Sequence, residues 1–356
     1  MTEKQLMSGS HIIGESAVLA GCRFYAGYPI TPQNELTEYS AAAMAKLPDG
    51  TFIQAESEIA AINMVLGASM AGARAMTSSS SPGISLKQEG ISFAAAMELP
   101  LVVVNTMRGG PGLGNIAPAQ GDYFQATRGG GHGDYRTIVL APASGQELAD
   151  LTRKAFEYAD KYLTPVMIIG DGMMGQMMEP VVFPEPIDPN TLPPKPWVLD
   201  GAKGRPSRLI KSLILDVDAE EALNWKLVKK YEKITNEITS LETYQTDNAR
   251  LVVIAYGTAA RIAKGAVKKL RDEGLKVGLA RPITLWPFPE VPLQDMTRHV
   301  TDFLVFEMST GQMLEDVRLA VQGQCNIHFY GRPGGIVSTP DEIAEQIRDI
   351  YNHQNG

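Results

Sequence analysis

Short β-rich runs alternate with helical stretches along most of the chain, and this alternation is the feature that most limits its fold. Three runs in the first half are strongly apolar, as is typical of strands buried on both faces of a sheet: 100–107 (PLVVVNTM), 136–142 (RTIVLAP) and 165–172 (PVMIIGDG). Shorter β-rich runs come before them. They lie at 23–28, 51–55 and 74–80. Such alternation predicts an α/β protein with a doubly wound parallel sheet.

Helices are expected between these strands. The run 58–72 is rich in small residues, and Ser57 just before it is a suitable N-cap. Further helices are expected at 86–99 and 145–162. We interpret the Ser, Pro and Gly residues that follow the strand 74–80 as a loop leading to the helix at 86–99.

The sequence changes character between residues 182 and 248. A proline-rich stretch there is typical of a surface linker, and a charged amphipathic helix follows it. The α/β pattern then resumes, with β-rich runs at 250–257, 276–287, 302–309 and 326–331, a helix at 259–274 and a last helix after Thr339–Pro340. We therefore predict a first domain at 1–181, a linker and helix at 182–248, and a second α/β domain at 249–356.

Composition excludes several classes of protein. The chain of 356 residues is 44% hydrophobic, carries a formal charge of −8 and has no basic block, which disfavours nucleic-acid and anionic-membrane partners. We see no signal peptide and no apolar run long enough for a membrane span. The two cysteines, Cys22 and Cys325, are too few for an iron–sulfur cluster, and we expect free thiols in a reducing cytoplasm.

Three glycine-rich stretches resemble cofactor motifs without matching them. Residues 108–115 (RGGPGLGN) and 127–136 (TRGGGHGDYR) lack the G-x-G-x-x-G spacing and open no amphipathic helix. We interpret both as loops that line a site, with plain flexible backbone as the alternative. The GDG at 170–172 is followed by prolines that forbid a continuous helix before the next Asn, Asn190, so we interpret it as a strand-terminal turn.

The stretch 26–36 (AGYPITPQNEL) places two prolines at the end of the first strand. Pro29 and Pro32 restrict the backbone on both sides of Thr31, which presents its hydroxyl at the carboxyl edge of the sheet. Two interpretations remain open. Thr31 either contacts a ligand there, or it caps the next helix with Pro32 at the first helical position.

Taken together, these motifs resemble the pyrimidine-domain (alpha-type) subunit of the 2-oxoacid:ferredoxin oxidoreductases, and most of all the branched-chain 2-oxoisovalerate subgroup. The resemblance covers nearly the whole chain. It rests on five stretches: GYPITPQNEL, QAESEIAAINMVLGAS, ARAMTSSSSPGISLKQEG, VVVNTMRGGPGLG and GGGHGDYRTIVLAP. It implies a thiamine diphosphate-binding fold followed by a transketolase C-terminal-like domain.

The resemblance also implies a function that several chains share. Thiamine diphosphate would bind between this subunit, which holds the aminopyrimidine, and a beta-type subunit, which holds the diphosphate and Mg²⁺. The reaction would be the oxidative decarboxylation of a 2-oxoacid to acyl-coenzyme A and CO₂. The partners would be the beta-type and gamma-type subunits, a ferredoxin-like subunit with 4Fe–4S clusters, and ferredoxin. The isolated chain is expected to be inactive.

Site residues follow from the same resemblance. It places the carboxylate that pairs with the aminopyrimidine at Glu58, whereas the residues alone do not separate Glu58 from Glu56. It places Tyr28 and Pro29 against the aminopyrimidine.

Substrate contacts are implied too. Thr31 would lie within hydrogen-bonding reach of the substrate, and Arg108 would grip the substrate carboxylate as a planar bidentate donor. Arg128 and Arg136 are weaker candidates for that carboxylate, and His132 is left open between a substrate contact and a loop residue.

In the second domain, the stretches ARPITLWPFP and FEMSTGQM match the family, which implies that Glu307 and Gln312 lie at a seam between domains or subunits.

Alternatives remain for the substrate and for the class. A pyruvate or 2-oxoglutarate enzyme is the closest alternative, although a dicarboxylate would need a second cation that is not evident beside the motifs. A non-catalytic α/β protein that binds a phosphorylated ligand through its glycine-rich loops is the alternative from a different class.

Overall fold

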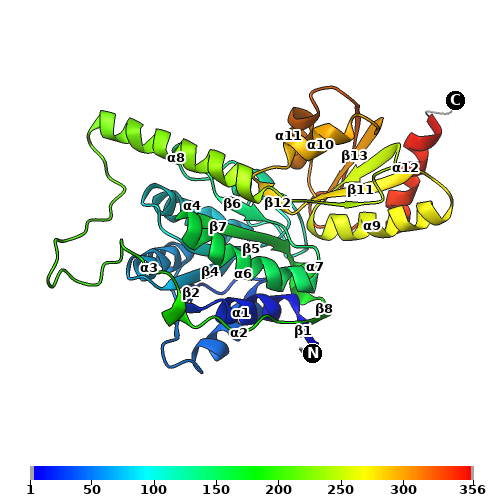
Figure 1. The fold of residues 1–356 in the computed structure, drawn as a ribbon. Helices are drawn as coiled ribbons and strands as arrows, with labels where there is room; N and C mark the ends of the chain where they lie inside the picture. The colour runs from blue at the N-terminus through cyan, green and yellow to red at the C-terminus, as the bar shows by residue number, and fades with distance from the viewer. Residues whose placement is uncertain (1–3, 354–356) are drawn as a thin grey trace.

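The computed structural model describes residues 4–353 and folds them around two sheets (Figure 1). The first sheet has seven strands in the order β12-β6-β7-β5-β4-β2-β3. All are parallel except β12, which pairs antiparallel with β6. Their bounds are β2 Cys22–Gly27, β3 Thr51–Gln54, β4 Arg74–Ser79, β5 Leu101–Met107, β6 Ile138–Leu140, β7 Pro165–Asp171 and β12 Thr284–Trp286.

Helices cover both faces of this sheet, as the apolar strands predict. Alternate side chains of β5 point to opposite cores: Val103 packs with α3 (Glu58–Met70) and α4 (Ser81–Ala96), whereas Val104 packs with the helices of the other face. Those are α1 (Gly9–Leu19), α2 (Asn34–Met44) and α6 (Gly145–Tyr162). The predicted doubly wound α/β fold is confirmed.

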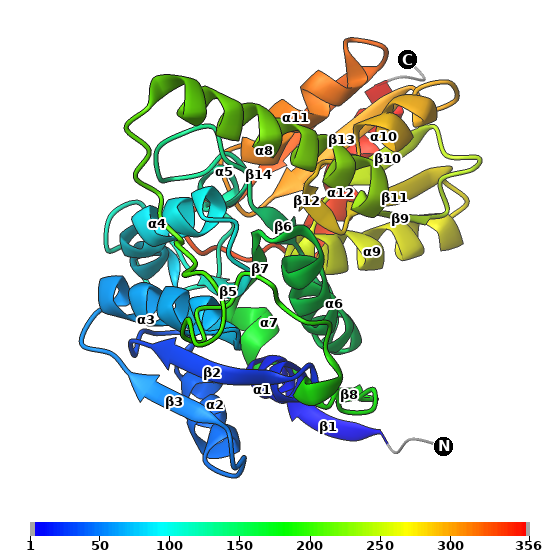
Figure 2. The same ribbon diagram turned by 60° about the vertical axis from the view of Figure 1, so that its left-hand side comes forward.

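A second sheet of five strands has the order β14-β13-β10-β11-β9. It is parallel apart from β9, and α9 and α12 pack on one face while α11 packs on the other, toward the first sheet (Figure 2). The bounds are β9 Leu241–Tyr244, β10 Leu251–Ile254, β11 Val277–Pro282, β13 Asp302–Glu307, β14 Asn326–Gly331, α9 Gly257–Asp272, α10 Glu290–Met296, α11 Gln312–Val321 and α12 Pro340–His353.

Two sequence-based interpretations were wrong, one at the start of α4 and one in the run 276–287. The Ser-Pro-Gly stretch after β4 is not a loop, because α4 begins at Ser81 with Pro82 in its first turn, where the missing N–H of proline costs no hydrogen bond. The run 276–287 is not one strand. It divides into β11 in the second sheet and β12, which extends the first sheet. The predicted domain boundaries stay a prediction, although the chain crosses between the sheets here.

The long helix α8 (Val217–Ile238) lies over the first sheet. A strand pair joins β1 (Gln5–Ser8) to β8 (Met178–Val181), and the proline-rich chain then leads to α8 through a loop that projects from the body of the molecule, as Figure 1 shows. Tyr231 and Ile234 of α8 are buried in the core of the first sheet. A cavity of about 860 Å³ lies beside α8, bordered by Trp225, Tyr231 and Trp286.

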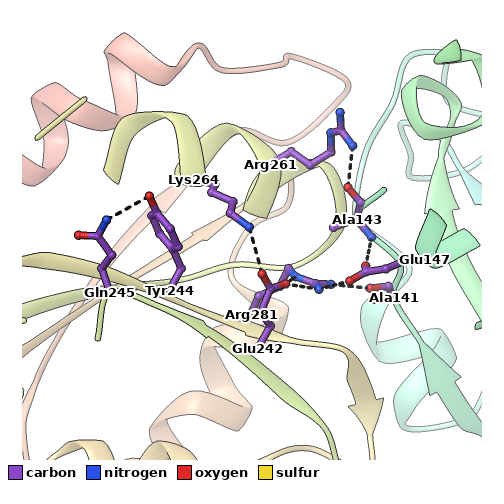
Figure 3. Close-up of polar contacts among 9 residues, drawn as sticks. All are labelled: Ala141, Ala143, Glu147, Glu242, Tyr244, Gln245, Arg261, Lys264 and Arg281. Atoms are coloured by element: carbon purple, nitrogen blue, oxygen red, sulfur yellow. Dashed lines mark hydrogen bonds and ion pairs between the residues drawn. The ribbon is translucent and has the colours of Figure 1, made fainter. Parts of the chain in front are cut away.

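Charged residues join the two sheets on one side of the molecule (Figure 3). The buried side chain of Arg281 on β11 contacts Glu242 of β9 and, at 2.5 Å, Glu147 of α6. Arg261 on α9 donates to the carbonyl oxygen of Ala143 at 2.8 Å. These contacts fix the second sheet against the C-terminal side of β6 in the first.

Across residues 4–353, no helix combines the length and the apolar character that a membrane crossing requires.

Candidate functional site

In doubly wound sheets a ligand-binding crevice forms at the carboxyl edge where the strand order reverses, and in the first sheet that reversal lies between β2 and β4. β3 lies on one side of β2 and β4 on the other, so the chain turns in opposite directions after β2 and after β4. The helices that follow those strands, α2 and α4, consequently cover opposite faces. Ligands of doubly wound sheets bind at such a reversal of strand order.

Glu58 lies at this edge, as the first residue of α3. Ser57 caps the helix as predicted, because its hydroxyl accepts the N–H of Ala60 at 3.1 Å. The Glu58 side chain is 5% exposed, and Oε1 accepts a hydrogen bond of 3.3 Å from the hydroxyl of Ser79 at the end of β4. Glu56, in contrast, is exposed. The two carboxylates, which the residues alone do not distinguish, therefore differ in burial.

Gly83 makes room for the Glu58 carboxyl group. A Cβ atom at position 83 would lie 2.0 Å from Ser79 Oγ and 2.4 Å from Glu58 Oε1, closer than real contacts allow. A side chain at position 83 would displace the Ser79 hydroxyl or the Glu58 carboxyl group, so this arrangement favours glycine in the first turn of α4.

Replacement Gly83→Ala should displace the Glu58 carboxyl group and lower turnover of the assembled enzyme by about tenfold or more, because misplacing a reacting group by an ångström is costly. Gly67→Ala is the matched control in α3, since a Cβ atom at position 67 would have no neighbour within 4 Å. That control should keep full turnover and gain up to about 1 kcal/mol in free energy of unfolding. Equal turnover in both variants would contradict the role given to Gly83.

Arg108 follows β5 and is 7% exposed. Its guanidinium donates from Nη1 to the Thr31 carbonyl and from Nη2 to the Leu113 carbonyl, each at 2.9 Å. Its Nε is buried with no hydrogen-bond partner among the described residues. Arg108 therefore ties the loop after β2 to the glycine-rich loop after β5 and keeps donor capacity for an anion.

The start of α4 connects Glu58 to Arg108. The Ser81 hydroxyl accepts the Arg108 N–H at 3.0 Å and donates to Asp122 at 2.6 Å. Ser79, two residues earlier, bonds Glu58. Burial raises the pKa of Asp122, while its hydrogen bonds from Ser81 and Asn105 lower it. The short junction between β4 and α4 thus contacts both Glu58 and Arg108.

The loop after β2 is held by a buried network that the sequence analysis missed. Gln33 Oε1 accepts the hydroxyls of Ser78 at 2.5 Å and Thr37 at 3.0 Å, and Gln33 Nε2 donates to the Tyr28 carbonyl at 3.3 Å. The Tyr25 hydroxyl bonds both Ser78 and Thr37. The one local signal for this network is Gln33 itself, a polar residue in the loop after β2 whose amide can both donate and accept.

The capping role considered for Thr31 is wrong. Helix α2 begins at Asn34, and the residue at its N-cap is Gln33, so Thr31 and Pro32 precede the helix. Thr31 is exposed, as are its neighbours Tyr28 and Pro29. All three therefore lie at the surface, in the loop after β2 that Arg108 ties to the glycine-rich loop after β5.

Other candidates lie elsewhere. Arg128 pairs with Asp316 at 2.9 Å, and Arg136 is exposed beside the cavity under α8. His132 is exposed, and its carbonyl accepts the Ser92 hydroxyl of α4 at 2.9 Å. The second glycine-rich loop therefore packs along α4, and only the first borders the crevice.

Both predicted seam residues lie where the two halves of the chain meet. The side chain of Gln312 contacts the N–H of Phe124 at 2.8 Å and the carbonyl of Gly121 at 2.7 Å, so it bridges the two sheets as predicted. Glu307 adjoins Met308, whose N–H donates to Gln120 of the first half. Its carboxylate accepts the N–H groups of Met313 and Leu314 at the start of α11, within its own half of the chain, because those amides lack partners in the helix.

The GDG turn also has a structural role, as predicted. Asp171 caps α7 (Gly172–Gln176) by accepting two backbone N–H groups, and Gly172 packs against Pro32 of the loop after β2. Within residues 4–353, no cluster of His, Cys, Asp and Glu is arranged to hold a metal ion.

A cleft of about 360 Å³ continues from the site toward the second sheet. Ser81, Gly110 and Asp122 border it from the first half of the chain, and Ser309 and Gln312 from the second. The glycine-rich loop after β5 is therefore shared between the predicted site and the seam.

Two family models match the chain. "Pyruvate flavodoxin/ferredoxin oxidoreductase, thiamine diP-bdg" matches residues 15–238, and "Pyruvate:ferredoxin oxidoreductase core domain II" matches residues 249–343. The first spans more than half of the chain.

Curated relatives cover the chain almost completely. The ketoisovalerate oxidoreductase subunit VorB of Methanothermobacter thermautotrophicus is 47% identical over 346 residues, 97% of each chain. The 2-oxoglutarate synthase subunit KorA of the same organism is 35% identical and covers 98% of this chain and 99% of its own length.

Solved structures agree on the fold. A 2-oxoglutarate:ferredoxin oxidoreductase from Magnetococcus marinus, with 2-oxoglutarate, coenzyme A and succinyl-CoA bound, matches with a TM-score of 0.87 at 28% identity. The match covers 98% of this chain and 65% of that one, so this chain spans about two-thirds of its length. A split-gene transketolase matches with a TM-score of 0.60 at 13% identity, which shows a shared fold alone.

Proposed function

This chain belongs to the alpha-type subunits of the 2-oxoacid:ferredoxin oxidoreductases, a family that binds thiamine diphosphate, and we propose that it supplies the aminopyrimidine site and the substrate-carboxylate site of such an enzyme. The observation that carries the proposal is the junction between β4 and α4, which holds the buried Glu58 and the buried Arg108 at one reversal of strand order.

The residues present fit the cofactor. Glu58 Oε1 receives one hydrogen bond of 3.3 Å from Ser79, which leaves the carboxyl group able to bond the aminopyrimidine, and Gly83 provides the room that the carboxyl group occupies. We assign Glu58 to hold the proton shared with the aminopyrimidine, and the exposed Tyr28 and Pro29 to contact the ring. Thiamine diphosphate, when bound, supplies the nucleophile for the oxoacid carbonyl and the electron sink for loss of CO₂.

Arg108 is assigned to the substrate carboxylate. Its buried guanidinium has an unpartnered Nε, and two carbonyl contacts fix its orientation before any substrate arrives. Such preorganisation reduces the entropy lost on binding. Thr31, in the loop that Arg108 ties down, is assigned a hydrogen bond to the substrate.

Other chains must supply the rest of the reaction. Burial raises the pKa of Cys22 to about 12 and that of Cys325 to about 11, so neither is a ready thiolate ligand. We therefore assign the diphosphate, Mg²⁺ and the iron–sulfur clusters to beta-type and ferredoxin-like subunits, beside a gamma-type subunit. Coenzyme A would accept the acyl group and ferredoxin the electrons.

A branched-chain 2-oxoacid such as 2-oxoisovalerate is the proposed substrate. The relative that acts on ketoisovalerate is 47% identical, compared with 35% for the one named for 2-oxoglutarate. A second carboxylate would need another cation, and Arg128 is engaged with Asp316 and the ring of Phe124. The apolar side chain of a branched-chain 2-oxoacid needs no second cation.

The test is to reconstitute the complex and compare kcat/KM for 2-oxoisovalerate, pyruvate and 2-oxoglutarate, following ferredoxin reduction with coenzyme A present. We expect 2-oxoisovalerate to be preferred over 2-oxoglutarate by at least about 100-fold, because an unpaired second carboxylate would be costly to desolvate. The isolated chain should show no turnover. Preference for 2-oxoglutarate would contradict the substrate, and turnover by the single chain would contradict the shared site.

A further inference from the structure

The glycine-rich loop after β5 leaves the first sheet at Arg108 and comes back beside it at Pro118, which forms a β-bridge with Arg108. At the tip of the loop, the Leu113 carbonyl accepts from the Arg108 guanidinium at 2.9 Å. The position of this guanidinium, which is assigned to the substrate carboxylate, therefore depends on what holds the loop.

The second half of the chain holds the loop. Gln120, which is fully buried, donates its backbone N–H to the Met308 carbonyl at 2.9 Å and accepts the Met308 N–H on Oε1 at 3.0 Å. Gln120 Nε2 donates to the Tyr256 carbonyl, and Asn115 Nδ2 to the Gly334 carbonyl, each at 2.9 Å. These three acceptors follow β10, β13 and β14, neighbouring parallel strands of the second sheet.

Gln312 of α11 holds the next residues of the same chain segment. Its Nε2 donates to the Gly121 carbonyl at 2.7 Å, and its Oε1 accepts the Phe124 N–H at 2.8 Å. Asp122 lies between these two contacts in the sequence. A side chain of the second half thus fixes the backbone on both sides of Asp122.

Asp122 connects this anchored segment to Arg108. Its Oδ2 accepts the Ser81 hydroxyl at 2.6 Å and the Asn105 amide at 2.8 Å. Because a serine hydroxyl has one proton, donation to Asp122 leaves Ser81 Oγ free to accept the Arg108 N–H at 3.0 Å. Without Asp122 the Ser81 proton could turn toward the Arg108 carbonyl, which lies 3.4 Å from Ser81 Oγ.

We propose that Asp122 is a positioning residue for Arg108, and that the second half of the chain acts through Gln312 and Asp122 on recognition of the substrate carboxylate. The inference rests on the proposed function, in which Arg108 binds that carboxylate. It gives the second sheet a part in substrate binding, besides joining the two halves of the chain.

The first test measures KM for 2-oxoisovalerate in the reconstituted complex, and the Kd of thiamine diphosphate by calorimetry. Asp122→Val removes the acceptor and should raise KM by about tenfold, because Arg108 is misplaced. The Kd should stay within about twofold, since the contacts of Glu58 with Ser79 and Gly83 remain. Asp122→Asn keeps an oxygen that can accept both bonds, so its KM should stay within about threefold of wild type.

Gln312→Met tests the contribution of the second half. Gln312 is half-buried, and its loss removes two hydrogen bonds that flank Asp122, so KM should rise by about threefold or more. Arg261→Met is the matched control at the other contact between the halves (Figure 3). It removes bonds to the Ala143 carbonyl at 2.8 Å and to Glu179 at 2.7 Å, and should leave KM unchanged. An equal rise of KM in both variants would show a general loosening of the two halves and overturn the inference.

Arg108→Met distinguishes the inference from the proposed function. If Arg108→Met raises KM while Asp122→Val and Gln312→Met keep the wild-type value, the inference fails and the proposed function stands. If Arg108→Met itself keeps the wild-type KM, the proposed carboxylate site fails and the inference with it. In the Arg108→Met background, Asp122→Val should raise KM no further, because Asp122 acts through Arg108. Should Asp122→Val prevent assembly, the comparison of Gln312→Met with Arg261→Met decides.

Discussion

Glu58→Gln should reduce kcat of the reconstituted complex by about 10²–10⁴-fold, the range that proton transfer by a positioned group contributes. A glutamine has nearly the same shape and can still accept from Ser79 Oγ, but it cannot share a proton with the cofactor ring. The measurement is the steady-state rate of ferredoxin reduction at saturating oxoacid and coenzyme A. Gel filtration should show an intact complex.

Glu56→Gln is the control for this prediction. Glu56 lies two residues earlier and is exposed, so the same change of charge leaves the buried site intact. We expect at least half of the wild-type kcat. If Glu56→Gln were the inactive variant and Glu58→Gln the active one, the assignment of the carboxylate would be wrong.

Arg108→Met should raise KM for the oxoacid by about 10- to 100-fold, because a hydrogen bond to a charged group contributes about 1.5–3 kcal/mol. It should also lower kcat, since the two carbonyls of Thr31 and Leu113 lose the donor that holds their loops. Initial rates across a wide range of oxoacid concentrations give both constants.

Arg108→Lys separates the two effects. Lysine keeps the charge but lacks the planar guanidinium group that can bond two carbonyls and a carboxylate together. We therefore expect Arg108→Lys to show part of the rise in KM and most of the fall in kcat that Arg108→Met shows. Arg128→Met is the matched control, because Arg128 is paired with Asp316 outside the crevice, and its KM should stay within about threefold of wild type. A normal KM in Arg108→Met would assign the carboxylate contact to another residue.

Local periodicity accounts for what could be predicted of the fold. The apolar strands, the helix 145–162 and the Ser57 cap are properties of neighbouring residues, and the structure has each of them close to the predicted bounds. The failures involve partners far away in sequence. The residues around Pro82 suit a loop as well as the first turn of a helix. Likewise, the residues of 284–286 do not indicate that this segment pairs with β6 of the first sheet and not with the second sheet.

The sequence by itself determined the α/β class, the family and the set of candidate residues, because strand alternation and motifs are written in contiguous stretches. Only the tertiary structure showed that Glu58 is buried while Glu56 is exposed, that Thr31 precedes the helix cap, and that Lys87 is buried against the backbone of Glu58. The physical reason is burial. Whether a carboxylate or an ammonium group is withdrawn from water depends on helices that meet across a sheet, and the close packing of α3 on α4 through Gly83 and Gly90 is a relation between segments that no single stretch contains.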